Sequence, residues 1–284
     1  MEENILVLGD SGTGKTHFAV QLFGRLFKSP TAIWKPKATP ENMEIFKSGF
    51  ERLAKGLEIE HTPSAFHQDI TFCVTNASAA EINFTYPDYA GEQLRNLVAD
   101  RRLNRAWQDR VQSSTSWLLF IKINNIKEVE DIVTRGMPNY GEISKTRAEE
   151  SQDNFQLGDQ AFYTELLQML VRIKEASFLM PSSLPQLTIM LSCWDEYKID
   201  NPDISKPGTA LLDKMPLFHT FLHANWPKNK LKTIGLSSTG RKLDEKVPDE
   251  DYLDNGPEKF GYLVGTNGIE ERDLTAIISL IHND

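Results

Sequence analysis

The chain has 284 residues, of which 40% are hydrophobic, and a formal net charge of −9 at pH 7. The length suits one large α/β domain with insertions, and the negative charge argues against nucleic acid or an anionic membrane as the main partner. The N-terminus has no signal-peptide pattern, and the apolar runs are far shorter than the roughly 18–20 residues that cross a membrane. We therefore expect a cytoplasmic protein whose two cysteines, Cys73 and Cys193, lie reduced in core strands.

Hydrophobic periodicity divides the chain into alternating helices and strands. The expected strands are residues 5–8, 69–74, 81–86, 117–123, 187–191 and 232–236. The expected helices are residues 14–27, 40–57, 93–112, 159–178, 211–224 and 273–281. A short turn joins the second and third strands, which indicates a hairpin. This order predicts a three-layer α/β/α sandwich, whose mostly parallel sheet has one antiparallel edge strand.

Three polar stretches interrupt this order, at about residues 28–68, 124–158 and 241–271. We interpret them as insertions within a single domain that covers residues 1–284. Long loops in compact domains are usually binding elements or disordered. The second and third stretches are therefore our candidates for a surface that binds a partner protein.

The first strand runs directly into a glycine-rich loop, Gly9-Asp10-Ser11-Gly12-Thr13-Gly14-Lys15-Thr16, which matches the P-loop pattern G-x-x-x-x-G-K-[ST]. The glycines let backbone N–H groups point at a polyphosphate, and the following helix adds its positive N-terminal end. Lys15 is expected to reach the β- and γ-phosphates, and the Thr16 hydroxyl to bind Mg²⁺. The strand before the loop and the amphipathic helix after it favour this interpretation over a plain turn. The sequence therefore predicts that the chain binds a nucleoside triphosphate.

The strand at 81–86 is followed by a second candidate loop, Asp88-Tyr89-Ala90-Gly91. Downstream of a P-loop, an Asp-x-x-Gly at a strand end brings a carboxylate to the metal and a glycine N–H to the γ-phosphate. On its own the tetrapeptide is more often an ordinary turn, but in this position we expect it to sense the third phosphate. The next helix has several arginines, which could include one that reaches a phosphate but are better explained as a solvated face. They are Arg95, Arg101, Arg102, Arg105 and Arg110.

Two later strands also end in polar loops. Ser192-Cys193-Trp194-Asp195 follows the strand at 187–191, and Ser237-Ser238-Thr239-Gly240 follows the strand at 232–236. In open α/β sheets, ligands bind at the carboxyl ends of the strands. We therefore expect these loops to lie at the same edge as the P-loop.

The order of these four loops resembles the Ras-like GTPases. Residues 9–16 match the Walker A motif of that family, and residues 88–91 match the Asp-x-x-Gly of its switch II. Residues 192–195 lie where the family has Asn/Thr-Lys-x-Asp, and residues 237–239 where it has Ser-Ala-Lys. The finer pattern is similar to the double-GTPase family of bacterial conflict and defence systems, whose GTPases are encoded beside partner proteins. The segments that carry this likeness are 9–16, 88–92, 191–195, 235–240 and 256–262.

This resemblance implies a Mg²⁺-dependent GTPase that hydrolyses GTP to GDP and phosphate and acts as a switch for a partner protein. Thr16, Asp88 and a switch I threonine would hold the metal. Thr62 is our choice for that threonine, with Ser64 and Thr71 as rivals. An ordinary turn threonine is an equally good interpretation of Thr62.

At the base end, the resemblance implies that Asp195 accepts hydrogen bonds from the guanine N1–H and 2-amino group. Adenine has no matching pair of donors, so the carboxylate would select guanine. Ser237 and Ser238 would lie in the loop that touches the base. Cys193 stands where the family has lysine, so the lysine stem is missing, and Trp194 could compensate by stacking on the base. A helix cap is the alternative role for Asp195.

The catalytic position also departs from the family. The glutamine that orients the attacking water follows the switch II glycine in Ras-like proteins, whereas this chain has Glu92 and then Gln93. The γ-phosphate would repel a glutamate, so we expect slow intrinsic hydrolysis. An arginine supplied by a partner raises the rate by about 10³–10⁵ in known cases.

Two other functions stay open on the sequence alone. An ATPase or a small-molecule kinase would use the same P-loop, although we find no arginine-rich lid of the kind a kinase needs. A nucleotide-binding interaction module with little hydrolysis would fit Glu92 and the altered base motif. Turnover with and without partner proteins would separate this module from a GTPase.

Overall fold

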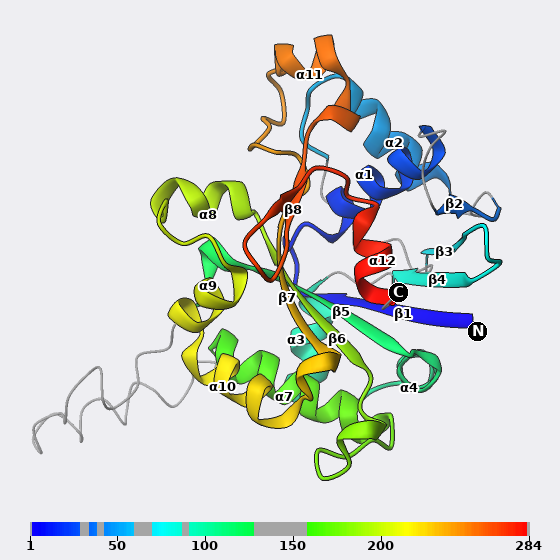
Figure 1. The fold of residues 1–284 in the computed structure, drawn as a ribbon, viewed down its shortest axis with the longest axis vertical. Coiled ribbons are helices and arrows are strands. Elements are labelled where there is room, and N and C mark those ends of the chain that lie inside the picture. Colours follow the sequence, from blue (N-terminus) through cyan, green and yellow to red (C-terminus); the bar gives the residue numbers. More distant parts are fainter. Residues whose placement is uncertain are drawn as a thin grey trace, which may run out of the picture.

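The computed structural model describes residues 2–28, 34–38, 43–59, 70–86, 91–127 and 158–282. The strands belong to one nine-stranded sheet in the order β2-β3-β4-β1-β5-β6-β7-β8-β9 (Figure 1). The strands are β1 Glu2–Gly9, β2 Lys35–Pro36, β3 Ile70–Thr75, β4 Glu81–Tyr86, β5 Ser116–Lys122, β6 Gln186–Ser192, β7 Leu231–Ser237, β8 Tyr262–Val264 and β9 Glu270–Glu271. The α-helices are α1 Lys15–Lys28, α2 Met43–Ala54, α3 Gly91–Asp100, α4 Arg105–Ser113, α7 Asp159–Ile173, α8 Trp194–Asp200, α9 Pro207–Lys214, α10 Pro216–Asn225, α11 Glu250–Asn255 and α12 Ala276–His282.

The centre of the sheet is parallel and its two edges are antiparallel. Strands β4, β1, β5, β6 and β7 pair in parallel, as the continuous apolar runs in the central strands predict. Strands β3 and β4 form the expected hairpin, and β2 extends this edge antiparallel to β3. At the other edge β8 pairs antiparallel to β7, and β9 to β8. The predicted fold class is confirmed, with antiparallel pairing at both edges instead of one.

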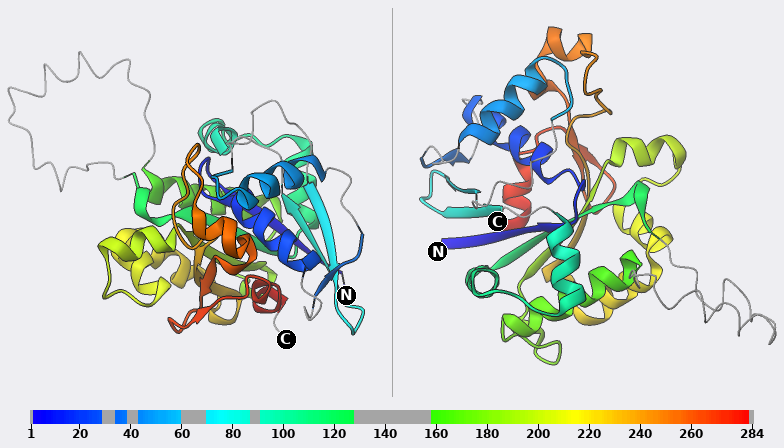
Figure 2. Two further views of the ribbon diagram at one scale, coloured as in Figure 1. Left: turned by 90° about the horizontal axis from the view of Figure 1, so that it is seen from above. Right: turned by 180° about the vertical axis from the view of Figure 1, so that it is seen from behind.

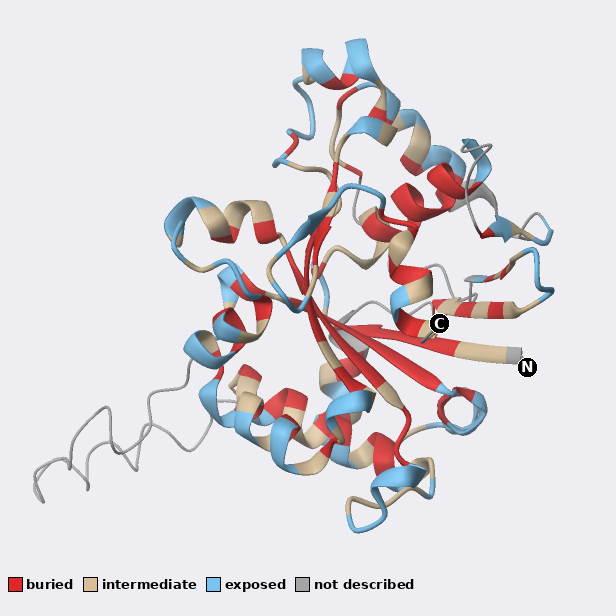
Figure 3. Ribbon diagram, viewed as in Figure 1, coloured by how far each residue is buried: buried red, intermediate tan, exposed pale blue. Residues whose placement is uncertain are grey.

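Helices cover both faces of the sheet and produce the expected three layers. One core cluster holds Phe18 of α1, Phe46 of α2 and Ile278 of α12 against one face. The other cluster holds Leu94 of α3 and Leu166 of α7 against the opposite face, together with side chains of α4, α8, α9 and α10. The view from behind in Figure 2 shows the same separation. The central strands are buried along most of their length, whereas the outward helix surfaces are exposed (Figure 3).

Two predicted helices are each divided in two. The expected helix at 93–112 breaks between α3 and α4, where Arg101 has a φ of 51° and the Asn104 side chain accepts a hydrogen bond from the Trp107 N–H as the N-cap of α4. The expected helix at 211–224 breaks at Met215 because Pro216 disfavours helical backbone in the residue before it. Helix α7 also ends earlier than predicted, at Ile173 instead of residue 178.

The stretch at 241–271, which we interpreted as a polar insertion, contains regular secondary structure. It contains α11 and the last two strands, and Arg25 of α1 holds it in place. The Arg25 guanidinium donates hydrogen bonds to the carbonyl oxygens of Phe260 and Arg272. Short strands with charged residues carry too little apolar periodicity to be recognised from sequence.

The two cysteines are free, but they are not both in strands. Cys73 lies in β3, whereas Cys193 lies just after β6 with a φ of 55°, and both side chains are only partly buried. Their predicted placement as core strand residues is therefore wrong for Cys193. Among the described helices, none has both the length and the apolar character needed to cross a membrane.

Candidate nucleotide-binding site

The P-loop connects the end of β1 to the start of α1 and packs tightly against β5. A Cβ at Gly9 would lie 2.8 Å from the Thr13 hydroxyl oxygen and 2.9 Å from Phe120 Cβ, so no side chain fits there. Gly12 and Gly14 have φ angles of 69° and 79°, which favour glycine. A Cβ at Gly12 would meet no atom within 4 Å, so this side of the loop faces open space. The backbone is thus curved as a phosphate-binding loop requires.

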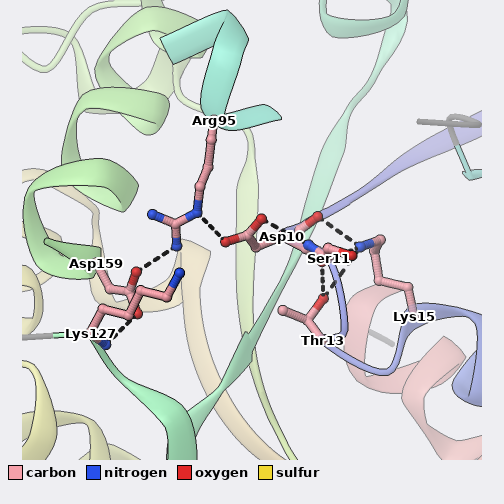
Figure 4. Close-up of polar contacts among 8 residues, drawn as sticks. Asp10, Ser11, Thr13, Lys15, Arg95, Lys127 and Asp159 are labelled. Atoms are coloured by element: carbon pink, nitrogen blue, oxygen red, sulfur yellow. Dashed lines mark hydrogen bonds and ion pairs between the residues drawn. The ribbon is translucent and has the colours of Figure 1, made fainter. Parts of the chain in front are cut away.

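Lys15 folds over the loop from the first turn of α1. Its Nζ donates hydrogen bonds to the carbonyl oxygens of Gly9 and Asp10, each at 2.7 Å, and contacts Thr13 Oγ1 at 3.3 Å (Figure 4). Burial lowers the pKa of Lys15 from 10.5 to about 8, and the nearby Asp10 carboxylate opposes this shift. A buried ammonium among carbonyl oxygens is a cation placed to bind a phosphate anion.

The expected metal ligands are described only in part. Thr16 is partly buried in the first turn of α1, directly after Lys15, and its hydroxyl is an oxygen ligand of the kind that magnesium takes beside a polyphosphate. Thr62 and Asp88 lie outside the described residues, so their roles stay predictions. Gly91 is the first residue of α3; Glu92 and Gln93 follow in its first turn, and their side chains also lie outside the described part.

An ion-pair network joins the P-loop to α3 and α7. The Arg95 Nε of α3 forms an ion pair with Asp10, and its Nη2 lies 2.6 Å from the Asp159 Oδ1 at the start of α7 (Figure 4). Asp10 Oδ1 accepts the Ser11 N–H at 2.8 Å, and Asp159 Oδ2 accepts the Lys127 N–H at 2.7 Å. Arg95 is therefore not part of a solvated helix face, which was the interpretation the sequence favoured.

The end of β6 leads into α8, which positions the two candidate base-binding residues differently. Trp194 is 2% exposed and packs in the core, where a Cβ at Gly235 would lie only 2.7 Å from Trp194 Cδ2. Its ring is thus enclosed by protein and has no face for a base, which contradicts the predicted stacking role. Asp195, the next residue, is only partly buried.

Asp195 and Ser237 meet where β6 and β7 end. Burial raises the pKa of Asp195, and a hydrogen bond with the Ser237 hydroxyl acts in the opposite direction by stabilising the carboxylate. Ser237 is fully buried, and its Oγ also accepts the Gly240 N–H at 2.8 Å. Ser238 is partly buried in the same loop. The structure therefore brings together the carboxylate and the serine loop that the sequence placed at the base end.

Comparison with known proteins decides the family. A model of the family described as Double-GTPase 1 matches residues 6–281. This chain belongs to the Double-GTPase 1 family. The double-GTPase resemblance seen in the sequence is thus confirmed. No curated protein matches the chain.

Solved structures that match this Double-GTPase 1 chain include the GTPase-like domain of Ski7 from S. cerevisiae. With GTP bound, it has 13% identity and a TM-score of 0.41, and the match covers 88% of this chain and 46% of that one. The same domain with GDP and inorganic phosphate bound has 10% identity and a TM-score of 0.37, and the match covers 84% of this chain and 43% of that one. The bacterial selenocysteine-specific elongation factor EF-Sec has 12% identity and a TM-score of 0.34, covering 84% of this chain and 26% of that one. This chain spans less than half the length of each of these three chains.

Sequence reasoning on this Double-GTPase 1 chain missed Asp159 and Lys127 as parts of the site. They are 32 residues apart, because Lys127 lies near the start of the stretch we assigned to an insertion and Asp159 directly follows its end, so no local pattern links them. The sequence did contain a signal that Arg95 belongs to the site, because Arg95 follows Gly91 by four residues and so lies on the same face of the helix. That spacing distinguishes it from the other arginines of the segment.

Proposed function

We propose that this Double-GTPase 1 chain binds GTP with Mg²⁺, hydrolyses it to GDP and phosphate, and thereby acts as a nucleotide-controlled switch for a partner protein in bacterial antiphage defence. The observation that carries the proposal is the meeting of Asp195 and Ser237 at the same sheet edge as the P-loop. In this proposal the loop binds the phosphates and the Asp195 carboxylate reads the base, as recognition of a guanine nucleotide requires.

In this proposal the phosphates bind over the P-loop. Lys15 Nζ exchanges contacts with the carbonyl oxygens of the loop for contacts with the β- and γ-phosphates. The Thr16 hydroxyl, with Asp88 and Thr62 as further proposed ligands, holds Mg²⁺, which neutralises charge that develops on the phosphate oxygens. The Lys15 ammonium then stabilises the charge that develops in the transition state more than that of the ground state.

Guanine recognition falls to Asp195, with Ser237 as the group that orients it. A carboxylate accepts both the N1–H and the 2-amino hydrogen of guanine, whereas adenine offers no such pair. Glu92 and Gln93 follow Gly91 and are the proposed groups that position the attacking water. Because Glu92 brings a negative charge toward the phosphate, we propose slow hydrolysis that a partner accelerates.

Calorimetric titration with GDP, a GTP analogue, ADP and an ATP analogue, each with Mg²⁺, tests the nucleotide assignment. We expect wild-type protein to bind the guanine nucleotides and Asp195→Asn to lose most of that affinity. An asparagine amide matches xanthine, which has an N1–H donor and a 2-oxo acceptor. The variant should therefore gain affinity for xanthosine diphosphate, which an unfolded variant could not do.

An adenine-nucleotide ATPase is the second candidate. Cys193 in place of the lysine of the guanine motif and the enclosed ring of Trp194 both reduce the contacts available to a guanine base. Equal binding of ADP and GDP, or no effect of Asp195→Asn, would favour this candidate. GTP turnover measured by phosphate release, with and without a co-encoded protein, tests the switch.

A further inference from the structure

Arg95 connects three elements of the structure, the P-loop, α3 and α7. Its two carboxylate partners belong to the P-loop and to α7, and its guanidinium carbon lies 4.5 Å from the centroid of the Phe162 ring on α7. The side chain of Arg95 is 27% exposed, that of Asp10 14% and that of Asp159 6%. Planar stacking and two carboxylates fix the guanidinium in one orientation.

The position of Arg95 on α3 gives this contact its importance. Gly91 is the first residue of the helix and Arg95 follows one turn later, so the two lie on the same face. Side chains of a helix lean toward its N-terminus, so Arg95 reaches back along the turn that Gly91 begins. Fixing the Arg95 guanidinium therefore fixes the place of the first turn of α3 relative to the P-loop.

The ion pair between Arg95 and Asp10 also neutralises a negative charge at the P-loop. The Asp10 carboxylate lies beside a site for polyphosphate, where an unpaired negative charge would repel the ligand. Arg95 pairs with Asp10 from the side of the loop away from Lys15, as Figure 4 shows. Asp10 is thereby free to accept the Ser11 N–H and hold the curve of the loop.

We propose that Arg95 is a positioning residue for the third phosphate: by docking on Asp10 and Asp159 it holds the first turn of α3 beside the P-loop, so that the Gly91 N–H is presented to the γ-phosphate. This inference rests on the proposed binding of a nucleoside triphosphate. A diphosphate lacks the phosphate that the Gly91 N–H would contact in this proposal. Arg95 therefore sets the preference for triphosphate over diphosphate, and α7 senses the same event through Asp159.

The test compares the dissociation constants of a GTP analogue and of GDP in wild-type protein and in Arg95→Gln. The ratio of the two dissociation constants reports on the third phosphate alone, because exposing the Asp10 charge weakens the binding of both nucleotides. We expect the triphosphate preference to fall by roughly 10–100-fold, the value of one hydrogen bond to a charged group. In Arg95→Gln with Asp10→Asn, overall affinity should recover while the preference stays lost.

Arg101→Gln is the matched control. Arg101 pairs with Glu165 of α7 at 2.6 Å from just beyond the other end of α3, but its side chain is 75% exposed and lies at the opposite end of the helix from Gly91. It should leave the preference unchanged, and Asp159→Asn should reduce it. Arg95→Lys should restore it only in part, because lysine lacks the planar fork.

An unchanged preference in Arg95→Gln, or an equal loss in Arg101→Gln, would overturn the positioning role while wild-type binding still supports the proposed function. If wild-type protein binds adenine nucleotides instead, the same ratio measured with an ATP analogue and ADP tests the role of Arg95. Protein that binds no nucleotide would overturn both proposals.

Discussion

The Ser237 hydroxyl hydrogen-bonds the Asp195 carboxylate and so joins the loops that follow β7 and β6. Parallel neighbouring strands bring these loops together, although 42 residues separate the two side chains in the chain. The bond stabilises the charged form of a partly buried acid, which is the form that the proposed recognition of guanine requires. Burial and hydrogen bonding therefore act on the same carboxylate in opposite directions.

Ser237→Ala should make guanine binding more sensitive to acid. Without the hydroxyl, the pKa of Asp195 rises further, and only the carboxylate form binds guanine. GDP affinity is therefore lost as pH falls through that pKa, and the loss should begin at a higher pH in the variant. At neutral pH we expect about a fivefold weaker affinity, the value of one ordinary hydrogen bond. Calorimetry across pH checks this, with the exposed Ser182→Ala, outside the site, as control, and superimposable profiles of Ser237→Ala and wild-type protein would contradict it.

Nucleotide affinity should also fall as pH rises above the pKa of Lys15. That pKa is about 8 in the free protein, and a bound phosphate raises it by stabilising the ammonium. Binding then requires proton uptake above pH 8, so GDP affinity decreases between about pH 8 and 9. The residual affinity of Lys15→Ala should be flat over that interval. A similar slope in the variant would show that another group titrates.

The lowered pKa of Lys15 also makes stability depend on pH, but stability rises with pH where nucleotide affinity falls. The pKa of Lys15 is lower in the folded chain than its ordinary value of 10.5, so the unfolded chain binds more protons between about pH 8 and 10.5. The Lys15 contribution to the free energy of unfolding therefore rises with pH across that interval. Urea unfolding of wild-type protein and Lys15→Ala at several pH values measures the difference.

Gly235→Ala should destabilise the fold. The new Cβ would lie 2.7 Å from Trp194 Cδ2 and 3.1 Å from Trp194 Cε3, and the enclosed ring cannot move unless α8 moves too. We expect a loss of about 1–3 kcal/mol in the free energy of unfolding. GDP affinity should weaken as well, because Asp195 follows Trp194. Urea unfolding and calorimetry measure the two effects.

Gly208→Ala is the matched control for that substitution. Gly208 lies in α9, and a Cβ there meets no atom within 4 Å. The alanine should stabilise the fold by about 0.4–1 kcal/mol, because it reduces the freedom of the unfolded chain. If both alanines have the same effect, the close approach of Trp194 to Gly235 is wrong.

Arg25→Met should destabilise the fold by about 2–4 kcal/mol, because two carbonyl oxygens lose a charged donor. Burial also lowers the pKa of Arg25, in keeping with a side chain that is largely enclosed. Urea unfolding measures the loss. Arg272→Met is the control, since that side chain is 86% exposed and should change stability by no more than about 0.5 kcal/mol.

The sequence predicted the phosphate end of the site better than the rest, because one short motif contains its geometry. Gly9 to Thr16 fixes the strand, the loop and the helix start within eight residues. The base end was predicted from order alone. No local pattern there indicates that Trp194 turns into the core, because its burial depends on the missing side chain of Gly235, which is distant in sequence.

The errors in the fold arose where local signals oppose periodicity. The apolar periodicity continues across Arg101 and across Met215, so it predicts one helix in each place. Arg101 has left-handed backbone, and Met215 precedes a proline, and these two features end the helices. The strand β9 consists of two glutamates and is held by pairing with β8. Its conformation comes from a neighbouring strand, and no property of the segment itself predicts it.

The two outer strands have a consequence for how a partner can dock. Strand β9 consists of Glu270 and Glu271, both exposed, and β2 consists of Lys35 and Pro36. An incoming strand would bury carboxylates at one edge, and at the other it would meet a proline that has no N–H to donate. Extending the sheet by strand addition is thus disfavoured at both edges. A partner of the proposed switch is therefore expected to bind to helices and loops, and edge-to-edge pairing between copies of this chain is disfavoured as well.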